Sequence, residues 1–388
     1  MNNALGAATL IAGVAVGGMG LVAAFIAIAC GIVTLLWWWL REHKRPLSLR
    51  RFNQNPILGP DPSHWWESEA VFNPAAFTAD GKVHILYRAM GRDGISRIGY
   101  ASSEDGVRFT RLPYPVYSPD RGFGVPRTDR VYGPLSYSQT HYASGGGWGG
   151  IEDPRAIKID GKLYMSFVAF DGWGFVRMAL TSMPLPKFLN KDWQWKKAAF
   201  LSPPNEIHKN WVLFPERVGG RYAVLHSITP KISIEYVDSL ESFDDEDTYI
   251  HSPGRSGGRP GEWDSIVRGA GAPPIRTSEG WLLLYHGMDA NNQGIGYKVG
   301  AMLLDLEDPT RVLYRSSQPI LVPSEWYEND WKPGVIIATG AVVIGDDLMV
   351  YYGGGDKYVA AARANLRDFL RRLKYDEQAE LEPVKLQV

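Results

Sequence analysis

The sequence is short of cysteine and has no excess of either charge. Cys30 is the single cysteine in 388 residues, which excludes an intramolecular disulfide and fits a reducing compartment. Lys and Arg total 41 and Asp and Glu total 42, whereas a nucleic-acid-binding protein typically carries a strong basic excess. We therefore expect no nucleic-acid partner.

The sequence also lacks the signatures of a resident metal or nucleotide cofactor. Its 8 histidines form no HxxxH or Cys-His pattern. No glycine fingerprint of the Walker or Rossmann kind follows a strand and opens a helix. We expect neither a metal nor an organic cofactor.

Charged residues are absent from the first 40 positions. The apolar stretch over 4–40 exceeds the about 20 residues that a membrane-spanning helix needs. It ends in three tryptophans, 37–39, and a basic cluster follows at 41–51. Tryptophan favours the membrane interface and basic residues favour the cytoplasmic side. We therefore predict an uncleaved transmembrane helix over 1–40, in contact with the lipid bilayer, and a single-pass membrane protein with a cytoplasmic catalytic domain.

Tryptophan, tyrosine, glycine and proline are plentiful, at 14, 19, 42 and 26 residues. This composition favours an all-β protein with many turns. Beyond residue 70 one unit recurs, in which a short strand, a turn and a strand with aromatic residues follow one another. Its five copies begin at Phe72, Ile151, Asn210, Gly269 and Ile337.

The turns are the strongest part of this repeat. Dipeptides of the hairpin type join two apolar runs in four of the copies, and the next strand alternates apolar and polar residues with a period of two. These dipeptides are Asp80-Gly81, Asp160-Gly161, Gly219-Gly220 and Glu279-Gly280. Repeats of this length are typical of propeller blades, whereas a two-sheet sandwich would not explain five similar units. We predict an all-β, five-bladed β-propeller over 71–375, after a basic juxtamembrane linker and entry segment (41–70) and before a tail (376–388).

Equivalent ends of the blade strands should bring polar residues to one mouth of the propeller channel. The first strands place Asn73, Glu152-Asp153, Asn210 and Gly271 there. The second strands end at Arg88, Val168–Phe170, His226, His286 and Tyr352–Asp356. A slip of one residue in the register would scatter this set.

A carboxylic acid among cations and neutral hydrogen-bonding groups suits glycoside chemistry. Asp153, followed by Pro154 and Arg155, is the candidate acid that protonates the leaving oxygen, and the cations would hold an anionic attacking group such as phosphate. The alternative for Asp153 is a residue that merely caps a turn.

The strings FNPA, YRA, EDPR, LFPE, GWLLLYHG and YYGGGD, in this order, resemble glycoside hydrolase family 130. The resemblance covers about residues 52–375 and implies an inverting β-mannoside phosphorylase or a β-mannosidase on a five-bladed propeller. It implies that Asp153 is the single general acid and that its proton travels through a hydroxyl of the mannosyl ring. Inorganic phosphate is then a co-substrate, mannose 1-phosphate a product, and an oligosaccharide or glycan the substrate.

The resemblance also assigns binding roles. The expected substrate-binding residues are Asn73, Arg88, Arg155, Asn210 and Asp356. The expected phosphate-binding residues are Arg88, Lys209, Arg268 and His286, with Arg268 in place of a lysine found in many members.

Two other functions stay open at this stage. A hydrolase on the same fold would use water and need a base, for which Glu152 and Asp264 are candidates. A non-catalytic, membrane-tethered sugar-binding propeller would bind sugar without turnover. Phosphate-dependent release of mannose 1-phosphate separates the first two functions, and replacement of Asp153 by Asn separates both enzymes from the third.

Overall fold

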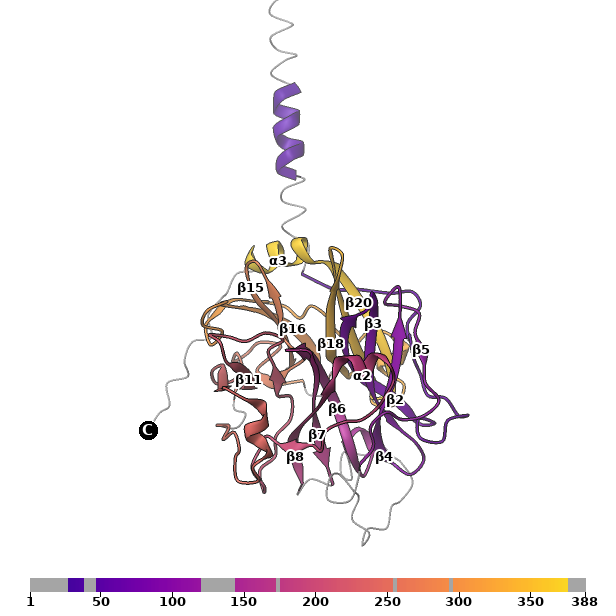
Figure 1. Ribbon diagram of the computed structural model, residues 1–388. Helices are drawn as coiled ribbons and strands as arrows, with labels where there is room; N and C mark the ends of the chain where they lie inside the picture. Colours follow the sequence, from indigo (N-terminus) through magenta and orange to yellow (C-terminus); the bar gives the residue numbers. More distant parts are fainter. Residues whose placement is uncertain are drawn as a thin grey trace, which may run out of the picture. The chain divides into compact units, whose positions relative to one another are not determined.

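The computed structural model describes residues 27–37, 47–119, 144–171, 175–253, 257–292 and 296–375. The chain divides into two compact units, Met1–Pro46 and Leu47–Val388. In the first unit, residues 27–37 form an α-helix. The second unit carries every strand of the described chain (Figure 1).

The structure contradicts the predicted membrane localisation. Within the ranges given above, no helix is long and apolar enough to cross a membrane. The predictions of a bilayer contact through residues 4–40 and of a cytoplasmic catalytic domain are corrected accordingly. Residues 4–26 and 38–40 of that predicted segment lie outside the described residues.

The second unit consists of successive antiparallel strand groups, which we number one to five in chain order. Group one contains β2 (Ala70–Ala79), β3 (Lys82–Met90), β4 (Ile95–Ser103) and β5 (Thr110–Arg111). Group two contains β6 (Gly149–Ile159), β7 (Lys162–Phe170), β8 (Val176–Pro184) and β9 (Ala199–Phe200). Group three contains β10 (Val212–Leu213), β11 (Tyr222–Ser227) and β12 (Ser233–Val237).

Groups four and five complete the unit. Group four contains β13 (Ile266–Ala270), β14 (Ile275–Thr277), β15 (Gly280–Met288), β16 (Lys298–Leu304) and β17 (Val312–Arg315). Group five contains β18 (Ile336–Ile344), β19 (Asp347–Gly354), β20 (Tyr358–Asn365) and, from the start of the unit, β1 (Arg50–Arg51), which pairs with β20. The helical elements are α2 (Leu185–Leu189), α3 (Leu366–Tyr375), η1 (Ser144–Gly146), η2 (Leu240–Asp244) and η4 (Trp326–Glu328).

The all-β prediction and the predicted hairpins are confirmed. Asp80 and Gly81 link β2 to β3, and Asp160 and Gly161 link β6 to β7. All four residues have positive φ, as a two-residue turn of type I′ requires at both central positions. A parallel contact between β4 and β6 joins groups one and two into one eight-stranded sheet.

The hydrophobic core lies between the groups. Among the described residues there are five large clusters, and each combines side chains from two consecutive groups. The fifth cluster joins the last group to the first: Tyr351 and Val359 pack with Val71 and Ile85, all fully buried. Full burial of such a side chain stabilises the fold by about 1.5–3 kcal/mol.

Three groups share a buried triad of a carboxylate, a tyrosine and an arginine. In each, the tyrosine on the second long strand donates its hydroxyl hydrogen to the carboxylate, and an arginine from the outer strand forms an ion pair with that carboxylate. The triads are Glu67–Tyr87–Arg111, Asp264–Tyr285–Arg315 and Glu328–Tyr352–Arg51. Since Arg51 lies on β1, the start of the second unit completes the triad of group five.

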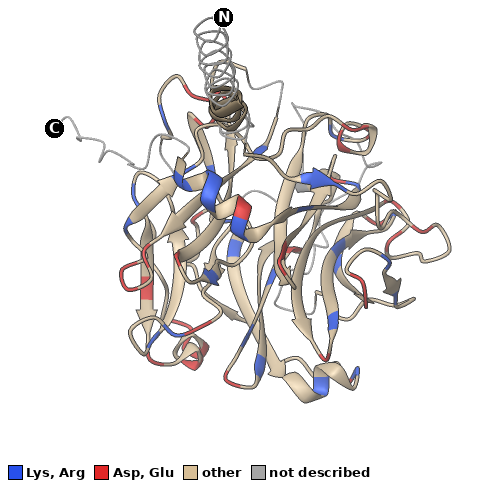
Figure 2. Ribbon diagram, turned by 90° about the horizontal axis from the view of Figure 1, so that it is seen from above, with Lys and Arg blue, Asp and Glu red and all other residues tan. Residues whose placement is uncertain are grey.

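Acidic and basic residues are both scattered over the ribbon of this unit (Figure 2). Many of them pair with each other at the surface, as Arg97 does with Asp93 and Arg217 with Asp160. This distribution agrees with the near-zero net charge.

Candidate active site

Bulges in the first strands of the groups expose the residues that form the site. In four groups the pairing register of the first strand with the next long strand shifts. These shifts lie between Phe72 and Ala75, Glu152 and Arg155, Val267 and Gly269, and Ala338 and Gly340. A bulge leaves residues out of the hydrogen-bonded ladder and re-aims their side chains. The polar residues released in this way are Asn73, Asp153, Arg268 and Thr339.

The backbone at these positions is unusual. Asn73, Asp153 and Asn210 have φ of 47°, 50° and 65°, and Asn210 directly precedes β10 in group three. Only a few per cent of non-glycine residues adopt positive φ, although Asn and Asp tolerate it better than most. Asp356, in the turn between β19 and β20, has the same feature at 52°. Such strain persists where the surrounding structure imposes it and is concentrated at functional sites.

The register shift of group four lies earlier on its strand than the shifts of groups one and two. It falls at Arg268, before the pair Gly269–His286, whereas the corresponding pairs Phe72–Arg88 and Glu152–Val168 precede Asn73 and Asp153. Gly271, which the sequence repeat aligned with Asp153, follows β13, and its carbonyl accepts a hydrogen bond from Arg155 Nε at 3.1 Å.

Asp153 is the centre of a polar network. Its Oδ1 accepts hydrogen bonds from Asn73 Nδ2 at 2.7 Å and from Arg88 Nη1 at 3.3 Å. Its backbone carbonyl accepts a hydrogen bond from Arg155 Nη1 at 2.6 Å. The residue is 9% exposed, so its carboxylate is almost fully buried beside Asn73 and Arg88.

The charge of Asp153 follows from these neighbours. Burial would raise the pKa of its carboxyl group, but the positive charges of Arg88, Lys209 and Arg155 and the hydrogen bond from Asn73 outweigh burial and hold the pKa at about 2. Asp153 is therefore ionised at neutral pH. To donate a proton it must first gain one, which requires a change in the surrounding charge.

Glu152, directly before the bulge, binds two cations. Arg88 donates from Nη2 to Oε1 at 2.9 Å, and Lys209 donates from Nζ to Oε2 at 3.0 Å. Arg88 is itself buried, with its guanidinium over the Phe72 ring at 4.6 Å from the centroid. Because Glu152 is 0% exposed and bridges both cations, it is not placed to activate a water molecule.

Arg155 connects Asp153 to the next two groups. Its Nη2 donates to Asn210 Oδ1 at 2.9 Å, and Asn210 Nδ2 donates to the Arg268 carbonyl at 2.7 Å. Both ends of the Asn210 amide are thus engaged, which fixes its orientation. Burial lowers the pKa of Arg155 to about 10, so it remains protonated at neutral pH.

His286 lies beneath this network as a neutral group. Its Nε2 accepts a hydrogen bond from the backbone N–H of Ala338 at 2.8 Å and therefore carries no proton. Burial, helped by the charge of Arg155, lowers its pKa to about 3. His286 thus lacks the positive charge that a cationic phosphate ligand would have.

A second cationic group lies between β13 and β20 and includes residues that the sequence did not predict. Lys332 Nζ donates to Asp356 Oδ2 at 3.2 Å, and Arg268 Nε donates to the Tyr297 hydroxyl at 3.1 Å. Both cations lie over the Tyr297 ring, at 6.0 and 5.4 Å from its centroid. Thr339, in the bulge of group five, is the other residue that the sequence did not predict.

A small cavity adjoins Lys209. Its lining includes Asn210, His226, Ser227 and Gly269. The Nδ1 atom of His226 is buried and has no hydrogen-bond partner, and burial lowers the pKa of this imidazole to about 4. A buried nitrogen of this kind is costly unless a ligand or water satisfies it.

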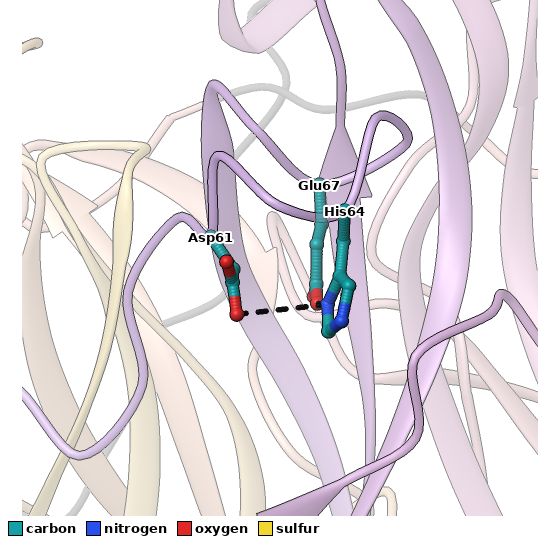
Figure 3. A group of neighbouring side chains, drawn as sticks. All are labelled: Asp61, His64 and Glu67. Atoms are coloured by element: carbon teal, nitrogen blue, oxygen red, sulfur yellow. Dashed lines mark hydrogen bonds and ion pairs between the residues drawn. The ribbon is translucent and has the colours of Figure 1, made fainter.

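A metal site is not supported at the one group of side chains with suitable atoms in the described part of the chain. The ligand atoms of Asp61, His64 and Glu67 all lie within 4.8 Å of one another (Figure 3). However, Glu67 belongs to the triad of group one, where Tyr87 and Arg111 contact its carboxylate. The arginine already supplies the positive charge that a metal ion would bring.

Asp264, the other candidate base, belongs to the triad of group four. It is 0% exposed and accepts hydrogen bonds from Arg259, Tyr285 and Arg315. It stabilises that group and is not available to activate a water molecule.

The fold and the site together fit a carbohydrate-active enzyme with buried carboxylates among cations. The family model for beta-1,4-mannooligosaccharide phosphorylase matches residues 141–374. The chain belongs to glycoside hydrolase family 130.

Its relatives agree with this assignment. The chain is 37% identical to 1,2-beta-oligomannan phosphorylase of Thermoanaerobacter sp., over 83% of this chain and 99% of the relative. It is 34% identical to beta-1,2-mannobiose phosphorylase of the same organism, over 81% of this chain and 96% of the relative. The solved structure of the Listeria innocua beta-1,2-mannobiose phosphorylase in complex with beta-1,2-mannobiose matches with a TM-score of 0.62 and 27% identity, over 84% of this chain and 99% of that chain.

Proposed function

We propose that this protein is an inverting phosphorylase of β-mannosides, with inorganic phosphate as co-substrate and mannose 1-phosphate as product. The observation that carries the proposal is the buried Asp153 carboxylate, which accepts hydrogen bonds from Asn73 and Arg88 in a chain that belongs to a family of mannoside phosphorylases. Attack by phosphate on the face opposite the leaving group would convert a β-mannoside into α-mannose 1-phosphate. The protein contributes one general acid, because phosphate is already a competent nucleophile.

We propose β-1,2-linked oligomannosides as the substrate class. Both Thermoanaerobacter relatives act on β-1,2 linkages by name and extend over more than four fifths of this chain. The family model is described by β-1,4 linkages, so a β-1,4-linked mannobiose is the comparison substrate.

The proposed phosphate seat contains Arg88, Lys209 and Arg268. Two of these cations lie beside Asp153 and Glu152, and the cavity next to Lys209 offers the unsatisfied Nδ1 of His226. Being neutral, His286 would contribute a hydrogen bond rather than a charge.

The mannosyl ring would bind to Asn73, Asn210 and Asp356, with Arg155 as their support. Three of these residues have the left-handed backbone described above, which holds a short polar side chain out of the strand ladder. Arg155 orients Asn210 and the Asp153 carbonyl at once.

Proton transfer depends on the occupied site. Phosphate beside Arg88 and Lys209 would offset the charges that keep Asp153 ionised, and its pKa would rise. The protonated carboxyl group would then donate to the leaving oxygen, directly or through a hydroxyl of the mannosyl ring. A general acid of this kind contributes typically about 10²–10⁴-fold to the rate.

The proposed framework for this site is a five-bladed β-propeller over 71–375. The five core clusters between consecutive groups support it, because the last of them joins group five to group one. Residues 41–70, the predicted entry segment, would supply β1 and its Arg51 to the last blade. The predicted tail, 376–388, lies outside the described residues.

The test is product analysis with β-1,2-mannobiose in the presence and absence of inorganic phosphate. Phosphorus NMR should show α-mannose 1-phosphate only when phosphate and active enzyme are both present. Equal release of free mannose without phosphate would refute the phosphorylase and favour the hydrolase. Sugar binding with no turnover under either condition would refute both enzymes.

A further inference from the structure

Glu152 is a buried carboxylate that takes part in no step of the proposed reaction. It lies on β6, pairs with Val168 across the strand ladder and is 0% exposed. Removing a carboxylate from water costs several kcal/mol, which close and well-oriented cations must offset. Its presence beside Asp153 therefore calls for a physical reason.

The reason is found in the two cations that Glu152 holds. Arg88 comes from β3 of group one and Lys209 from the segment before β10 of group three, so no local backbone geometry sets the distance between them. Each cation binds a different oxygen of Glu152, at 2.9 and 3.0 Å. Their spacing is set by the width of one carboxylate, and a phosphate ion presents pairs of oxygens of similar spacing.

The charges around Asp153 give the second part of the reason. Three cations, Arg88, Arg155 and Lys209, face two carboxylates, Glu152 and Asp153, with a neutral His286 below. The net charge of this set is +1 in the empty site. Without the charge of Glu152 it would be +2, which favours any bound anion and opposes protonation of Asp153.

We propose that Glu152 is a positioning residue that fixes Arg88 and Lys209 at the spacing phosphate needs and offsets part of their charge, so that phosphate binds reversibly. This inference rests on the proposed function and deepens it. In this role Glu152 is neither an acid nor a base. Its fixed negative charge stays beside Arg88 and Lys209 when phosphate binds to them.

Two substitutions at Glu152 separate this role from a purely structural one, because they should act in opposite directions. E152Q keeps the size of the side chain and removes the charge. It should lower the Kd for inorganic phosphate by about threefold or more, the effect of one unit charge at roughly 6 Å with water-like screening. Its kcat should fall and its pH optimum should move to lower pH, since Asp153 is then harder to protonate.

E152D keeps the charge but shortens the side chain. It should retain the wild-type pH optimum, while its shorter reach releases one cation and raises the Kd for phosphate. E241Q is the matched control, because Glu241 in η2 also pairs with a lysine, Lys162 at 2.7 Å, but this pair is exposed and lies outside the site. It should leave phosphate binding and the pH profile unchanged.

The measurements are isothermal titration of the full chain with inorganic phosphate and initial rates of phosphorolysis across pH. Weaker or unchanged phosphate binding in E152Q overturns the inference. If E152Q does not fold, the E152D variant alone tests the inference. Wild-type values of both the phosphate Kd and kcat in E152D would then overturn the inference. Failure of the wild type to bind phosphate and to form mannose 1-phosphate would instead refute the proposed function.

Discussion

Replacement of Asp153 by asparagine isolates the proposed proton donor. The amide has the size of the carboxyl group, and its oxygen can still accept from Asn73 Nδ2 and Arg88 Nη1. The variant should therefore fold and bind phosphate. Loss of a general acid should lower kcat for β-1,2-mannobiose by about 10²–10⁴-fold, which corresponds to about 2.7–5.4 kcal/mol of activation free energy.

The assay compares two leaving groups. An aryl β-mannoside whose phenolate departs without protonation needs no acid, so D153N should lose less than about tenfold of its rate on this substrate. D160N is the matched control, because Asp160 also has positive φ but lies in the exposed β6–β7 turn, about 20 Å further along the strand. Equal losses for D153N on both substrates would refute the acid role and indicate a defect in positioning.

Three further predictions test the framework of the site. R51M should destabilise the protein by about 3 kcal/mol in urea denaturation, because it leaves the buried Glu328 carboxylate without its cation. R363M removes an exposed ion pair and should cost under about 1 kcal/mol. Equal effects would contradict the role of β1 in completing group five. G145A should lower kcat by about tenfold or more, because a Cβ there would lie 2.9 Å from a guanidinium nitrogen of Arg88. G161A is the control, because Gly161 also has positive φ but faces open space, and it should keep the wild-type rate. Equal rates would contradict the close packing of η1 on the site. Between pH 3 and 6.5 the unfolded chain protonates His286 and the native state does not, so stability should rise with pH by up to about 1.4 kcal/mol per unit. H286Q should flatten this slope, and an unchanged slope in thermal denaturation would refute the neutral assignment.

The sequence predicted the hairpins and placed Asp153 near Arg88, as the structure has them, whereas the catalytic role of Asp153 stays a prediction. Hairpin dipeptides such as Asp80-Gly81 depend on backbone preferences of two residues, and strand alternation depends on a period of two. Both signals are local, so they survive without tertiary information. The ordered motifs that contain Asp153 and Arg88 are likewise short and contiguous.

The sequence failed where several elements must cooperate. It did not predict the register shift at Arg268, because a bulge of one residue leaves no periodic signal on its own strand. It left Glu152 open as a candidate base of the alternative hydrolase, because the burial of Glu152 and its two cation partners depend on residues distant in the sequence. It predicted a membrane-spanning helix from hydropathy, whereas the helix described in that region covers residues 27–37.

By itself, then, the sequence determined which residue types recur in each repeat and where the chain turns, since these depend on neighbours within a few positions. The tertiary structure decided which side chains meet: Lys332 beside Asp356, Arg268 on Tyr297 and Glu152 between two cations. The reason is that charge, burial and pKa at the site arise from the packing of separate strand groups. Those distances are set by the hydrophobic clusters between the groups and not by any local pattern.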